Sequence, residues 1–324
     1  MKAYVCRRYG GPEVVQLEEL PDPTPRPDEI LVRIHATSVT AADWRVRTLA
    51  VPPGLGLFAR LALGVARPRQ PILGTELAGV VEATGRDVTR YRAGDAVMAF
   101  PGSKMGCHAE LRALPESGPV AAKPAKLSFE EAASLPFGAA TALDFLRKAR
   151  VRAGEELLVV GASGGVGTAV VQLARHLGAR VTGVTSARNV DLVRSLGADD
   201  VVDYTREDVA SRGARYDVVV DTVGDMSFPR CKPLLREGGR FVPVAGGLPE
   251  LWAATRTRFS RGRRVIAAVA EERPELVAEV AELAASGALR PVIDRIHPFD
   301  EMREAHAYVE TRRKRGSVVV RVLP

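Results

Sequence analysis

One glycine-rich stretch constrains the fold more than any other feature of the chain. It runs from Val159 to Asn189 and reads VVGASGGVGTAVVQLARHLGARVTGVTSARN. An apolar run leads into a turn of small residues, and a second apolar run starts after Gly178, a residue type that commonly ends a helix. Between them, one face of a predicted helix contains Val166, Val170, Leu173, Ala174 and Leu177. The pattern predicts strand, turn, helix and strand in a parallel, doubly wound sheet.

The turn has the composition of a phosphate-binding loop. Read as A-x-G-x-x-G, it places Ala162, Gly164 and Gly167 at the three positions that require small residues. Small residues permit the tight turn, let the backbone approach a pyrophosphate and let the helix pack on the strand. We therefore expect a dinucleotide to contact Gly161, Ala162, Ser163, Gly164, Gly165, Val166 and Gly167. The alternative is a glycine-rich turn that binds no ligand.

The end of the second strand indicates which dinucleotide is bound. An NAD site usually has Asp or Glu about 20 residues beyond the turn, where it holds the ribose hydroxyls. This chain has TSAR at that point, with no carboxylate before Asp191. A 2′-phosphate is repelled by a carboxylate but suits the hydroxyl of Ser186 and the guanidinium of Arg188. The sequence therefore favours NADP(H), unless Arg188 is merely a surface residue of an arginine-rich chain.

The rest of the chain divides into a β-rich part and an alternating part. Before Ser128, short runs of Val, Ile and Thr are separated by Gly, Pro and Asp, which is typical of strands and turns. Ser128–Ala149 predicts one helix, because apolar residues recur at helical spacing behind a Ser cap that is paired with Glu131. Strands and helices then alternate, and the final RGSVVVRVLP is strand-like again. We expect an α/β protein whose C-terminus returns to the β-rich part.

Composition excludes several other classes of protein. No apolar run is long enough to span a bilayer, and the first residues lack the pattern of a signal peptide, so we expect a cytoplasmic protein without a membrane span. Cys6, Cys107 and Cys231 form no CxxC pair, which disfavours disulfides and a cysteine-built zinc site. The net charge is +7, and the densest basic cluster is Arg256–Arg264. It has one aromatic residue and no nucleic-acid motif, so a solvated loop or a cofactor-phosphate fringe is favoured over nucleic-acid binding.

Further motifs extend the pattern over nearly the whole chain. They include LGTELAGVVEATG, YRAGDAVMAF, LSFEEAASLPFGAATAL, YDVVVDTVG and RRKRGSVVV. In this order they resemble the medium-chain dehydrogenase/reductase superfamily, in its zinc-free quinone oxidoreductase branch. The resemblance implies a GroES-like catalytic domain at residues 1–124 and 288–324, and a Rossmann NADP(H)-binding domain at residues 125–287. It also implies a homo-oligomer, with a dimer as the family's usual form.

The same resemblance implies roles for individual residues beside the cofactor. Ser186 and Arg188 match positions that hold the 2′-phosphate, and Tyr204 matches a tyrosine that packs beside it. Thr141 matches a position near the nicotinamide. Loops that border the cofactor contain Val223, Gly224, Ala245 and Gly246. The ending Arg315-Gly316-Ser317 departs from the R-G-K of the family, which puts the contact made by that lysine in doubt.

The resemblance also locates the positions where zinc alcohol dehydrogenases have their catalytic ligands. These positions fall on Thr40, on Thr75 and near Phe137, none of which is a strong zinc ligand. The four-cysteine structural lobe is missing as well, so we expect no metal site. Thr40 also replaces an Asn that is common in this branch, so the role of that polar neighbour is only partly preserved.

Without zinc as a Lewis acid, the hydride acceptor must itself be activated, as quinones and α,β-unsaturated carbonyls are. We expect a zinc-independent oxidoreductase that transfers hydride from NADPH to such a substrate. Candidate catalytic groups are Thr40 and Asp43, although a structural role is favoured for Asp43, and His108 is a weaker candidate. Two alternatives stay open: a dedicated enoyl or alkenal reductase of a biosynthetic pathway, and a non-catalytic NADPH-binding redox sensor or nucleic-acid-binding protein. The apolar segment Leu49–Gln70 is either a substrate-pocket wall or a subunit contact.

Overall fold

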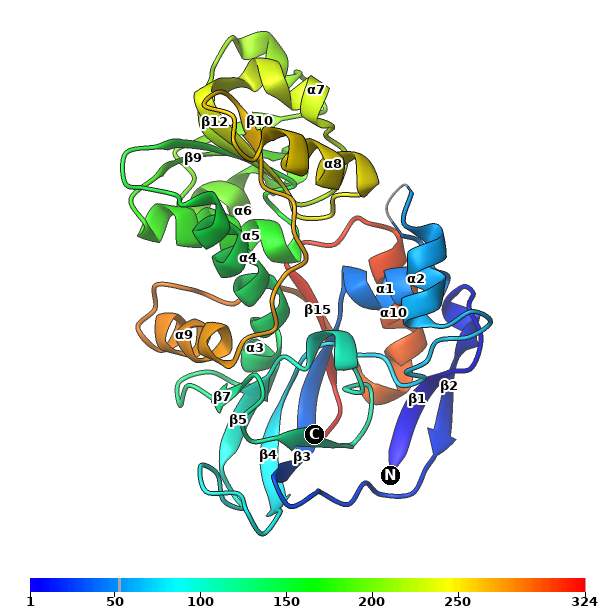
Figure 1. The fold of residues 1–324 in the computed structure, drawn as a ribbon. Coiled ribbons are helices and arrows are strands. Elements are labelled where there is room, and N and C mark those ends of the chain that lie inside the picture. Colours follow the sequence, from blue (N-terminus) through cyan, green and yellow to red (C-terminus); the bar gives the residue numbers. More distant parts are fainter. Residues whose placement is uncertain (52–53, 324) are drawn as a thin grey trace. The chain divides into compact units, whose positions relative to one another are not determined.

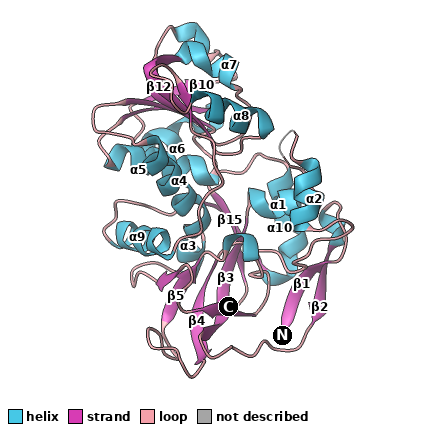
Figure 2. Cartoon of the chain, viewed as in Figure 1, coloured by secondary structure: helices cyan, strands magenta, loops and turns pink. Residues whose placement is uncertain are grey.

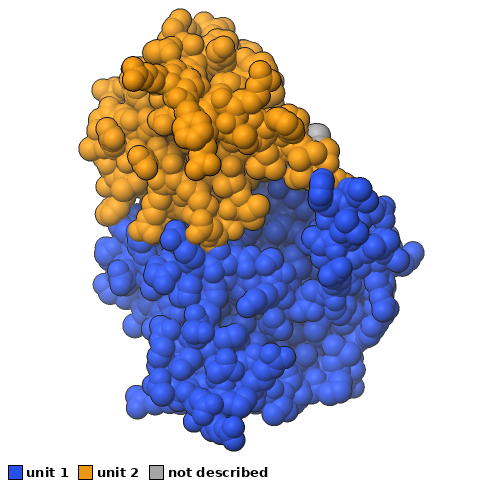
Figure 3. Space-filling view, in the orientation of Figure 1, with its two compact units in different colours: residues 1–51, 57–140, 272–324 blue, residues 52–56, 141–271 orange. Residues whose placement is uncertain are grey.

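The computed structural model describes residues 1–51 and 54–323, which fold into two compact units. Unit 1 comprises the described residues of 1–51, 57–140 and 272–324, and unit 2 those of 52–56 and 141–271 (Figure 3). Unit 1 is therefore assembled from both ends of the chain, and unit 2 is formed mainly by its middle (Figure 1).

Unit 2 contains a six-stranded sheet in which every pairing is parallel (Figure 2). The strand order is β10-β9-β8-β11-β12-β13, so the first strand of the unit, β8, lies in the middle. This is the order of the Rossmann fold, and the prediction of a doubly wound parallel sheet is confirmed. The strands are β8 (Glu156–Val160), β9 (Arg180–Thr185), β10 (Asp200–Asp203), β11 (Tyr216–Asp221), β12 (Leu235–Pro243) and β13 (Arg264–Val265).

The helix that follows the glycine-rich turn is α5 (Gly165–His176). Val170, Leu173 and Ala174 of the predicted stripe are fully buried. Leu177 was expected on the same stripe but is 40% exposed, because the helix ends before it and Gly178 turns the chain away with φ +81°. The other helices of unit 2 are α6 (Val190–Ser195), α7 (Phe228–Cys231), α8 (Leu248–Thr257) and most of α4 (Pro136–Ala149).

The single helix expected at Ser128–Ala149 is wrong, because the structure has two helices there. They are α3 (Phe129–Ala133) and α4, and they meet at Pro136. Proline has no N–H to donate and its ring clashes with the preceding turn, so it begins a helix but does not continue one. The predicted cap is confirmed: Ser128 N donates to Glu131 Oε2 at 2.8 Å, and Glu131 N donates to Ser128 Oγ at 3.1 Å.

Unit 1 is built on a seven-stranded, mostly antiparallel sheet and a separate hairpin. The sheet order is β14-β15-β3-β4-β5-β7, with β6 paired to β3. The C-terminal strand β15 pairs with β3, so the predicted return of the chain end to the β-rich part is confirmed. The hairpin is β1 (Lys2–Cys6) with β2 (Val15–Glu19), and the sheet strands are β3 (Glu29–Val39), β4 (Leu77–Thr84), β5 (Ala96–Ala99), β6 (Leu111–Pro115), β7 (Val120–Ala122), β14 (Ile293–Pro298) and β15 (Ser317–Arg321).

Helices cover the strands of unit 1, and two of them bear on the domain boundaries. Helix α3 contacts β3, and α9 (Pro274–Ala285) contacts β7, so both belong to unit 1. The sequence analysis placed residues 1–124 and 288–324 in the catalytic domain and residues 125–287 in the Rossmann domain. That division assigns α3 and α9 to the Rossmann domain, and it stays a prediction. The remaining helices are α1 (Ala41–Thr48), α2 (Gly56–Leu63) and α10 (Met302–Glu310).

The apolar segment Leu49–Gln70 includes α2, which exposes Leu57, Phe58 and Leu61. Residues 52 and 53 of that segment lie outside the described residues, and its role as pocket wall or subunit contact stays open. Within the described part of the chain, α2 and all other helices are too short or too polar to cross a membrane.

Candidate functional site

The glycine-rich turn joins β8 to α5 in unit 2. Gly161 has φ +79°, and a Cβ there would clash with Val223 Cγ2. A Cβ on Gly167 would clash with the carbonyl oxygen of Gly161, because the first turn of α5 packs directly on the loop. The start of α5 leaves backbone N–H groups without partners inside the helix, and such groups bind phosphate. The residues present therefore fit the diphosphate of a dinucleotide.

Side chains at the end of β9 connect this turn to the predicted 2′-phosphate position. Thr185 Oγ1 donates to Ser163 Oγ at 2.9 Å. Asn189 Nδ2 donates to the same Ser163 oxygen at 3.0 Å and to Ser186 Oγ at 3.3 Å. The structure thus brings together two predicted residues, Ser163 and Ser186, through two that the sequence analysis did not assign. The signal that could have identified Asn189 is its place in the sequence: an Asn that ends the SARN motif and directly precedes a helical segment.

Arg188 and Tyr204 lie on the exposed rim of the same region. Arg188 is in the short 3-10 helix Ala187–Asn189, and its side chain is exposed. The backbone N–H of Tyr204 donates to the Thr185 carbonyl at 3.0 Å, which holds Tyr204 beside the end of β9 while its ring is 64% exposed. An exposed guanidinium and an exposed ring at one strand end can both reach an anionic ligand.

The loops after β11 and β12 meet the turn on its other side. Thr222 Oγ1 donates to the carbonyl oxygens of Val160 at 2.9 Å and Gly161 at 3.3 Å. Gly224 lies next to Ala245, since a Cβ on Gly224 would lie 3.6 Å from Ala245 Cβ. Ligands of open α/β sheets bind at the carboxyl ends of the strands, which is where these loops lie. Gly246 follows Ala245 in the same loop, whereas Thr141 is buried on α4.

A buried carboxylate fixes the loop that contains Val223 and Gly224. Asp221 ends β11 and accepts the backbone N–H groups of Val223 at 2.9 Å, Gly224 at 3.0 Å and Met226 at 2.9 Å. Burial raises the pKa of the Asp221 carboxyl, and the three backbone donors oppose that rise. The carboxylate therefore shapes the loop and is not itself a ligand-binding group.

Thr40 and Asp43 lie in unit 1, where they form a capping box at the start of α1. One oxygen of Asp43 accepts from Thr40 N at 2.7 Å and from Thr40 Oγ1 at 2.6 Å, and the other accepts from Gly74 N at 2.7 Å. Thr40 Oγ1 lies 3.4 Å from Thr75 Oγ1. The carboxylate of Asp43 is fully buried and is used by the chain itself, in agreement with the structural role favoured for it.

Glu76 is a buried acid beside this cluster that the sequence analysis did not assign. Its Oε2 accepts the backbone N–H of Phe137 at 2.6 Å, and its Oε1 accepts from Ser38 Oγ. Burial raises the pKa of Glu76 to about 7, while the two hydrogen bonds and the charge of Lys314 oppose that rise. Lys314 lies three residues before Ser317, which occupies the position of the family's R-G-K lysine, and burial lowers the pKa of Lys314 to about 8.

The residues at the zinc-ligand positions do not fit zinc. Thr40 and Thr75 present neutral hydroxyls, and Phe137 contributes a backbone N–H to Glu76. Zinc in proteins is bound by thiolate, imidazole and carboxylate groups. In the part of the chain that the structure describes, no three His, Cys, Asp or Glu side chains are close enough together to hold a metal ion. Cys6, Cys107 and Cys231 are buried, and burial raises the pKa of each thiol.

His108, the weaker catalytic candidate, belongs to a buried pair of histidines. His108 Nε2 lies 3.0 Å from the Ser38 carbonyl oxygen, and His108 Nδ1 lies 3.4 Å from His306 Nε2. Burial lowers the pKa of both imidazoles, and the charge of Asp43 opposes this for His108. Both rings are fully buried, so His108 packs in the core of unit 1.

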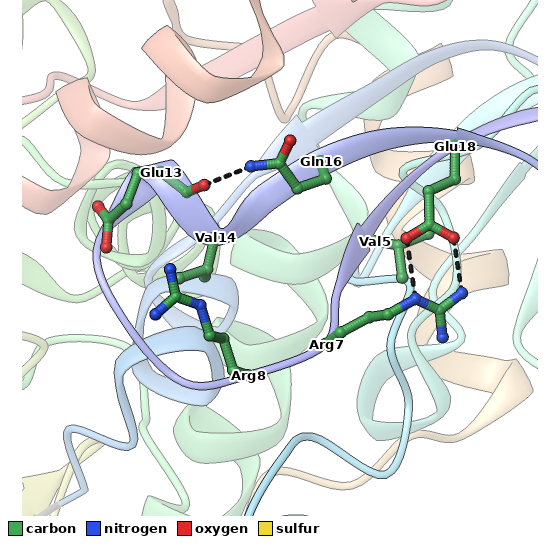
Figure 4. A pocket seen from close by; sticks show the side chains of 7 residues that line it. All are labelled: Val5, Arg7, Arg8, Glu13, Val14, Gln16 and Glu18. Carbon is green, nitrogen blue, oxygen red and sulfur yellow. Dashed lines mark hydrogen bonds and ion pairs between the residues drawn. The ribbon is translucent and has the colours of Figure 1, made fainter.

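A pocket of about 170 Å³ lies on the β1–β2 hairpin of unit 1 (Figure 4). Arg7 donates to the two carboxylate oxygens of Glu18 at 2.9 and 2.6 Å, and Gln16 Nε2 donates to the Glu13 carbonyl at 2.7 Å. These polar groups therefore hydrogen-bond to other groups of the same hairpin. The described residues that line this pocket are Val5, Arg7, Arg8, Glu13, Val14, Gln16 and Glu18. None of them was predicted to belong to the functional site.

The Arg256–Arg264 cluster is partly used by unit 2 itself. Arg263 Nε donates to the Leu235 carbonyl at 2.9 Å, and Arg263 also pairs with Glu237. The guanidinium of Arg258 lies over the ring of Phe259, 5.5 Å from its centroid. The cluster runs from the end of α8 to the start of β13, and these contacts lie within unit 2. The choice between a solvated loop and a cofactor-phosphate fringe stays open.

Two family models match the chain, one in each half. The model for the alcohol dehydrogenase GroES-like domain matches residues 26–125, and the model described as zinc-binding dehydrogenase matches residues 196–320. The second description names a metal, but the residues at the ligand positions of this chain are the two threonines and Phe137 described above.

Whole-length relatives extend these matches. The chain is 34% identical to 2-methylene-furan-3-one reductase of Solanum lycopersicum, over all of this chain and 80% of the relative. It is 31% identical to the chloroplastic NADPH-dependent alkenal/one oxidoreductase of Arabidopsis thaliana, with the same coverage. The solved structure of the quinone oxidoreductase from Coxiella burnetii superposes with a TM-score of 0.87 at 29% identity, covering 100% of this chain and 99% of the other. Together with the parallel sheet order and the glycine-rich turn, these matches show that the chain belongs to the medium-chain dehydrogenase/reductase superfamily, in its quinone oxidoreductase-like branch.

Proposed function

We propose that this protein is an NADPH-dependent oxidoreductase that reduces quinones or α,β-unsaturated carbonyls without zinc. The observation that carries the proposal is the composition of the site at the end of β9. Hydroxyl and guanidinium groups stand where an NAD site has a carboxylate, next to a turn that fits a diphosphate. Relatives named as alkenal/one and quinone oxidoreductases support the same class of substrate.

The residues of unit 2 would hold NADPH, which supplies a hydride when it is bound. The turn Gly161–Gly167 would bind the diphosphate through backbone N–H groups. Ser186 and Arg188 would bind the 2′-phosphate as donors, with Tyr204 packed beside it. Val223, Gly224, Ala245 and Gly246 would border the remainder of the cofactor, and Thr141 would support the nicotinamide end from α4.

The side chains of unit 1 offer hydroxyls in place of a Lewis acid. Thr40 and Thr75 each present a neutral Oγ1. Thr40 gives its one hydroxyl hydrogen to Asp43 in this structure, so that hydrogen must leave Asp43 before it is donated to a carbonyl oxygen. Either hydroxyl stabilises developing negative charge far less than zinc. Substrates whose own conjugation spreads that charge are therefore favoured over simple ketones and aldehydes. We place Thr40 as the catalytic candidate, and Asp43 as the residue that orients it.

NADPH oxidation measured with a panel of quinones, a panel of enones and a panel of simple ketones tests the substrate class. Turnover of either of the first two panels, with no turnover of the third, is the expected result. Metal analysis of the active protein should find far less than one zinc per chain. Turnover of ketones only, or a stoichiometric zinc that activity requires, would overturn the proposal.

The cofactor assignment has its own test in Arg188→Glu. The wild type should bind NADPH more tightly than NADH, and this substitution should remove most of the preference because it replaces a donor with a repelling charge. Arg194→Glu on α6 is the matched control, since it makes the same charge change at an exposed position on the next helix. An equal effect of the two substitutions would mean that Arg188 acts only through net charge.

We further propose a homo-oligomer, with a dimer as the expected form, and a cytoplasmic location. Both rest on family resemblance and composition. Analytical ultracentrifugation of the purified protein tests the first, and fractionation of the source cells tests the second.

A further inference from the structure

We propose that Asn189 is a specificity-determining residue, which acts by turning the hydroxyls of Ser163 and Ser186 outward as hydrogen-bond donors. The two serines then form a donor pair that recognises the 2′-phosphate of NADP(H). This inference rests on the proposed function, because it concerns the same cofactor site.

The position of Asn189 first shows that its side chain is not used for helix stability. Asn189 stands at the N-cap of α6, where an Asn commonly accepts a backbone N–H of its own helix. Its side chain makes no such bond to the described part of α6. It is only 4% exposed and points its Nδ2 at the two serine oxygens. The amide is therefore directed toward the loops of the cofactor site.

The amide is also held at a cost in stability. Asn189 Oδ1 is buried and has no hydrogen-bond partner among the residues that the structure describes. Buried polar atoms without a partner are rare in native proteins, because they lose their bonds to water and gain nothing in return. An apolar residue would avoid this penalty but would lose both Nδ2 hydrogen bonds, so the amide at this position acts to hold the two serine hydroxyls.

The hydrogen bonds fix the direction of the Ser163 hydroxyl. A serine oxygen accepts at two positions and donates one hydrogen. Ser163 Oγ accepts from Thr185 Oγ1 at 2.9 Å and from Asn189 Nδ2 at 3.0 Å, so both of its acceptor positions are used. Its own hydrogen must then point away from Thr185 and Asn189. Since Ser163 is partly exposed, that hydrogen is available to a ligand at the turn.

Ser186 is turned in the same sense. Its Oγ accepts from Asn189 Nδ2 at 3.3 Å, which leaves its hydrogen free to be donated on its exposed side. One amide therefore presents a donor from the β8–α5 turn and a donor from the β9–α6 loop. A phosphate, which only accepts, suits two donors, whereas a ribose 2′-hydroxyl is held by the acceptor oxygens of a carboxylate.

Asn189→Asp tests this directly, because it keeps the shape of the side chain and reverses its hydrogen-bonding sense. A carboxylate would accept from both serines, turn their hydrogens inward and add a negative charge. Asn189→Ala removes the amide without adding charge. Its only expected effect is that the hydroxyl hydrogens of the two serines are no longer held in one direction. The two substitutions together separate hydroxyl direction from charge repulsion.

The readout is the binding of two cofactor fragments, adenosine 2′,5′-bisphosphate and 5′-AMP, by titration calorimetry. The quantity compared is the ratio of their dissociation constants. We expect Asn189→Asp to lower the preference for the bisphosphate by at least about tenfold, and Asn189→Ala by about threefold, with little change for 5′-AMP. Ser195→Ala on the exposed face of α6 is the control and should leave the ratio unchanged.

Each outcome then decides one point. An unchanged ratio in Asn189→Ala, or a loss in Asn189→Asp that high salt abolishes, would overturn the inference and leave only charge repulsion. If Asn189→Asp does not fold, as judged by its circular dichroism melt, Asn189→Ala alone decides. A wild type that binds the two fragments equally would refute the proposed cofactor instead, so the two failures can be told apart.

Discussion

The carboxylate of Glu76 accepts the backbone N–H of Phe137 at 2.6 Å, although the two residues are 61 positions apart in the chain. Glu76 directly precedes β4, and Phe137 is the second residue of α4. A negative charge at the first turn of a helix is stabilised by the free N–H groups and by the helix dipole. The acid thus anchors the helix that leads to Thr141, at the edge of the cluster that contains Thr40 and Thr75.

Glu76→Gln should abolish the loss of folding stability that Glu76 causes as the pH rises. Burial raises the pKa of Glu76 from 4.5 to about 7, so the folded protein binds its proton more tightly than the unfolded chain. The stabilisation is complete below pH 4.5 and is lost as the pH rises through about 7. Glu76→Gln keeps an acceptor for Phe137 N and a polar partner for Ser38. It should therefore gain up to about 3 kcal/mol relative to the wild type between pH 5 and pH 8.

Urea unfolding of both proteins at the two pH values measures this difference. Other groups titrate equally in both proteins and cancel in the comparison. A wild type and a variant that differ by the same free energy at pH 5 and pH 8 would show that Glu76 is ionised throughout.

Asp43→Asn should damage folding more than chemistry. Asp43 accepts three donors, from Thr40 N, Thr40 Oγ1 and Gly74 N, and an amide offers one acceptor oxygen in place of two. At least one buried donor would then face the NH₂ group, at a cost of about 1–3 kcal/mol. The kcat of the folded variant should fall less than about tenfold, and the pH dependence of kcat should keep its shape.

Thermal melts with kcat measured on the folded fraction separate the two roles. Asp87→Asn, at an exposed position, is the control for loss of a carboxylate. A variant with wild-type stability but a loss of kcat of about a hundredfold or more would make Asp43 a catalytic residue.

The parts of the molecule that sequence predicts well are those determined by neighbouring residues. The turn, the helix after it and the parallel, doubly wound sheet follow from small residues, apolar periodicity and the alternation of strands with helices, and all agree with the structure. The local errors also have local causes. Apolar spacing continues across Pro136 and up to Leu177, whereas the helices begin at the first and end before the second.

The residues that sequence missed act across long separations. Glu76 matters because it meets Phe137, and Asn189 because it meets Ser163, 26 positions earlier. Neither a buried acid nor a non-capping Asn has a periodic signature, because its partner is chosen by the fold. The structural role of Asp43 could be expected from the sequence because its partner Thr40 lies within one helical turn. Its place among the catalytic candidates stays a prediction.

The buried histidine pair should make the protein sensitive to mild acid. His108 Nε2 donates to the Ser38 carbonyl, so His108 Nδ1 accepts from His306 Nε2, and both rings are neutral. Burial lowers the pKa of both rings, and the nearby positive charge of Arg47 lowers that of His306 further. The unfolded chain therefore binds these protons first. Stability is full above pH 6.5 and falls as the pH drops below it, because the unfolded chain takes up protons that the folded chain does not bind.

His306→Gln removes one of the two imidazoles that can take up a proton in mild acid, and it keeps an N–H group that donates to His108 Nδ1. The melting temperature of this variant should fall less between pH 7.5 and pH 5 than that of the wild type. His176→Gln, at an exposed position at the end of α5, should follow the wild type. Equal acid sensitivity of all three proteins would assign the loss of stability to other groups.

The two glycines of the turn should separate binding from folding. A Cβ on Gly167 would overlap the Gly161 carbonyl oxygen, whereas the atom nearest to a Cβ on Gly164 is that same oxygen at 3.5 Å, an ordinary contact. Gly164 also has φ −79°, which alanine adopts without strain. Gly167→Ala should therefore lose about 1–3 kcal/mol of stability through overpacking, even though alanine favours helices.

Gly164→Ala should fold normally and bind NADPH at least about tenfold more weakly, because its methyl group occupies the space where the backbone approaches the diphosphate. Thermal melts and NADPH titration of both variants measure the two effects. The opposite pattern, with Gly164→Ala unstable or binding NADPH as the wild type does, would mean that the diphosphate does not lie over this turn. A phosphate-binding turn requires that Gly164→Ala weakens NADPH binding without changing stability. The reason is that Gly161 and Gly167 determine the backbone conformation of the turn, whereas Gly164 lies on the surface that the diphosphate contacts.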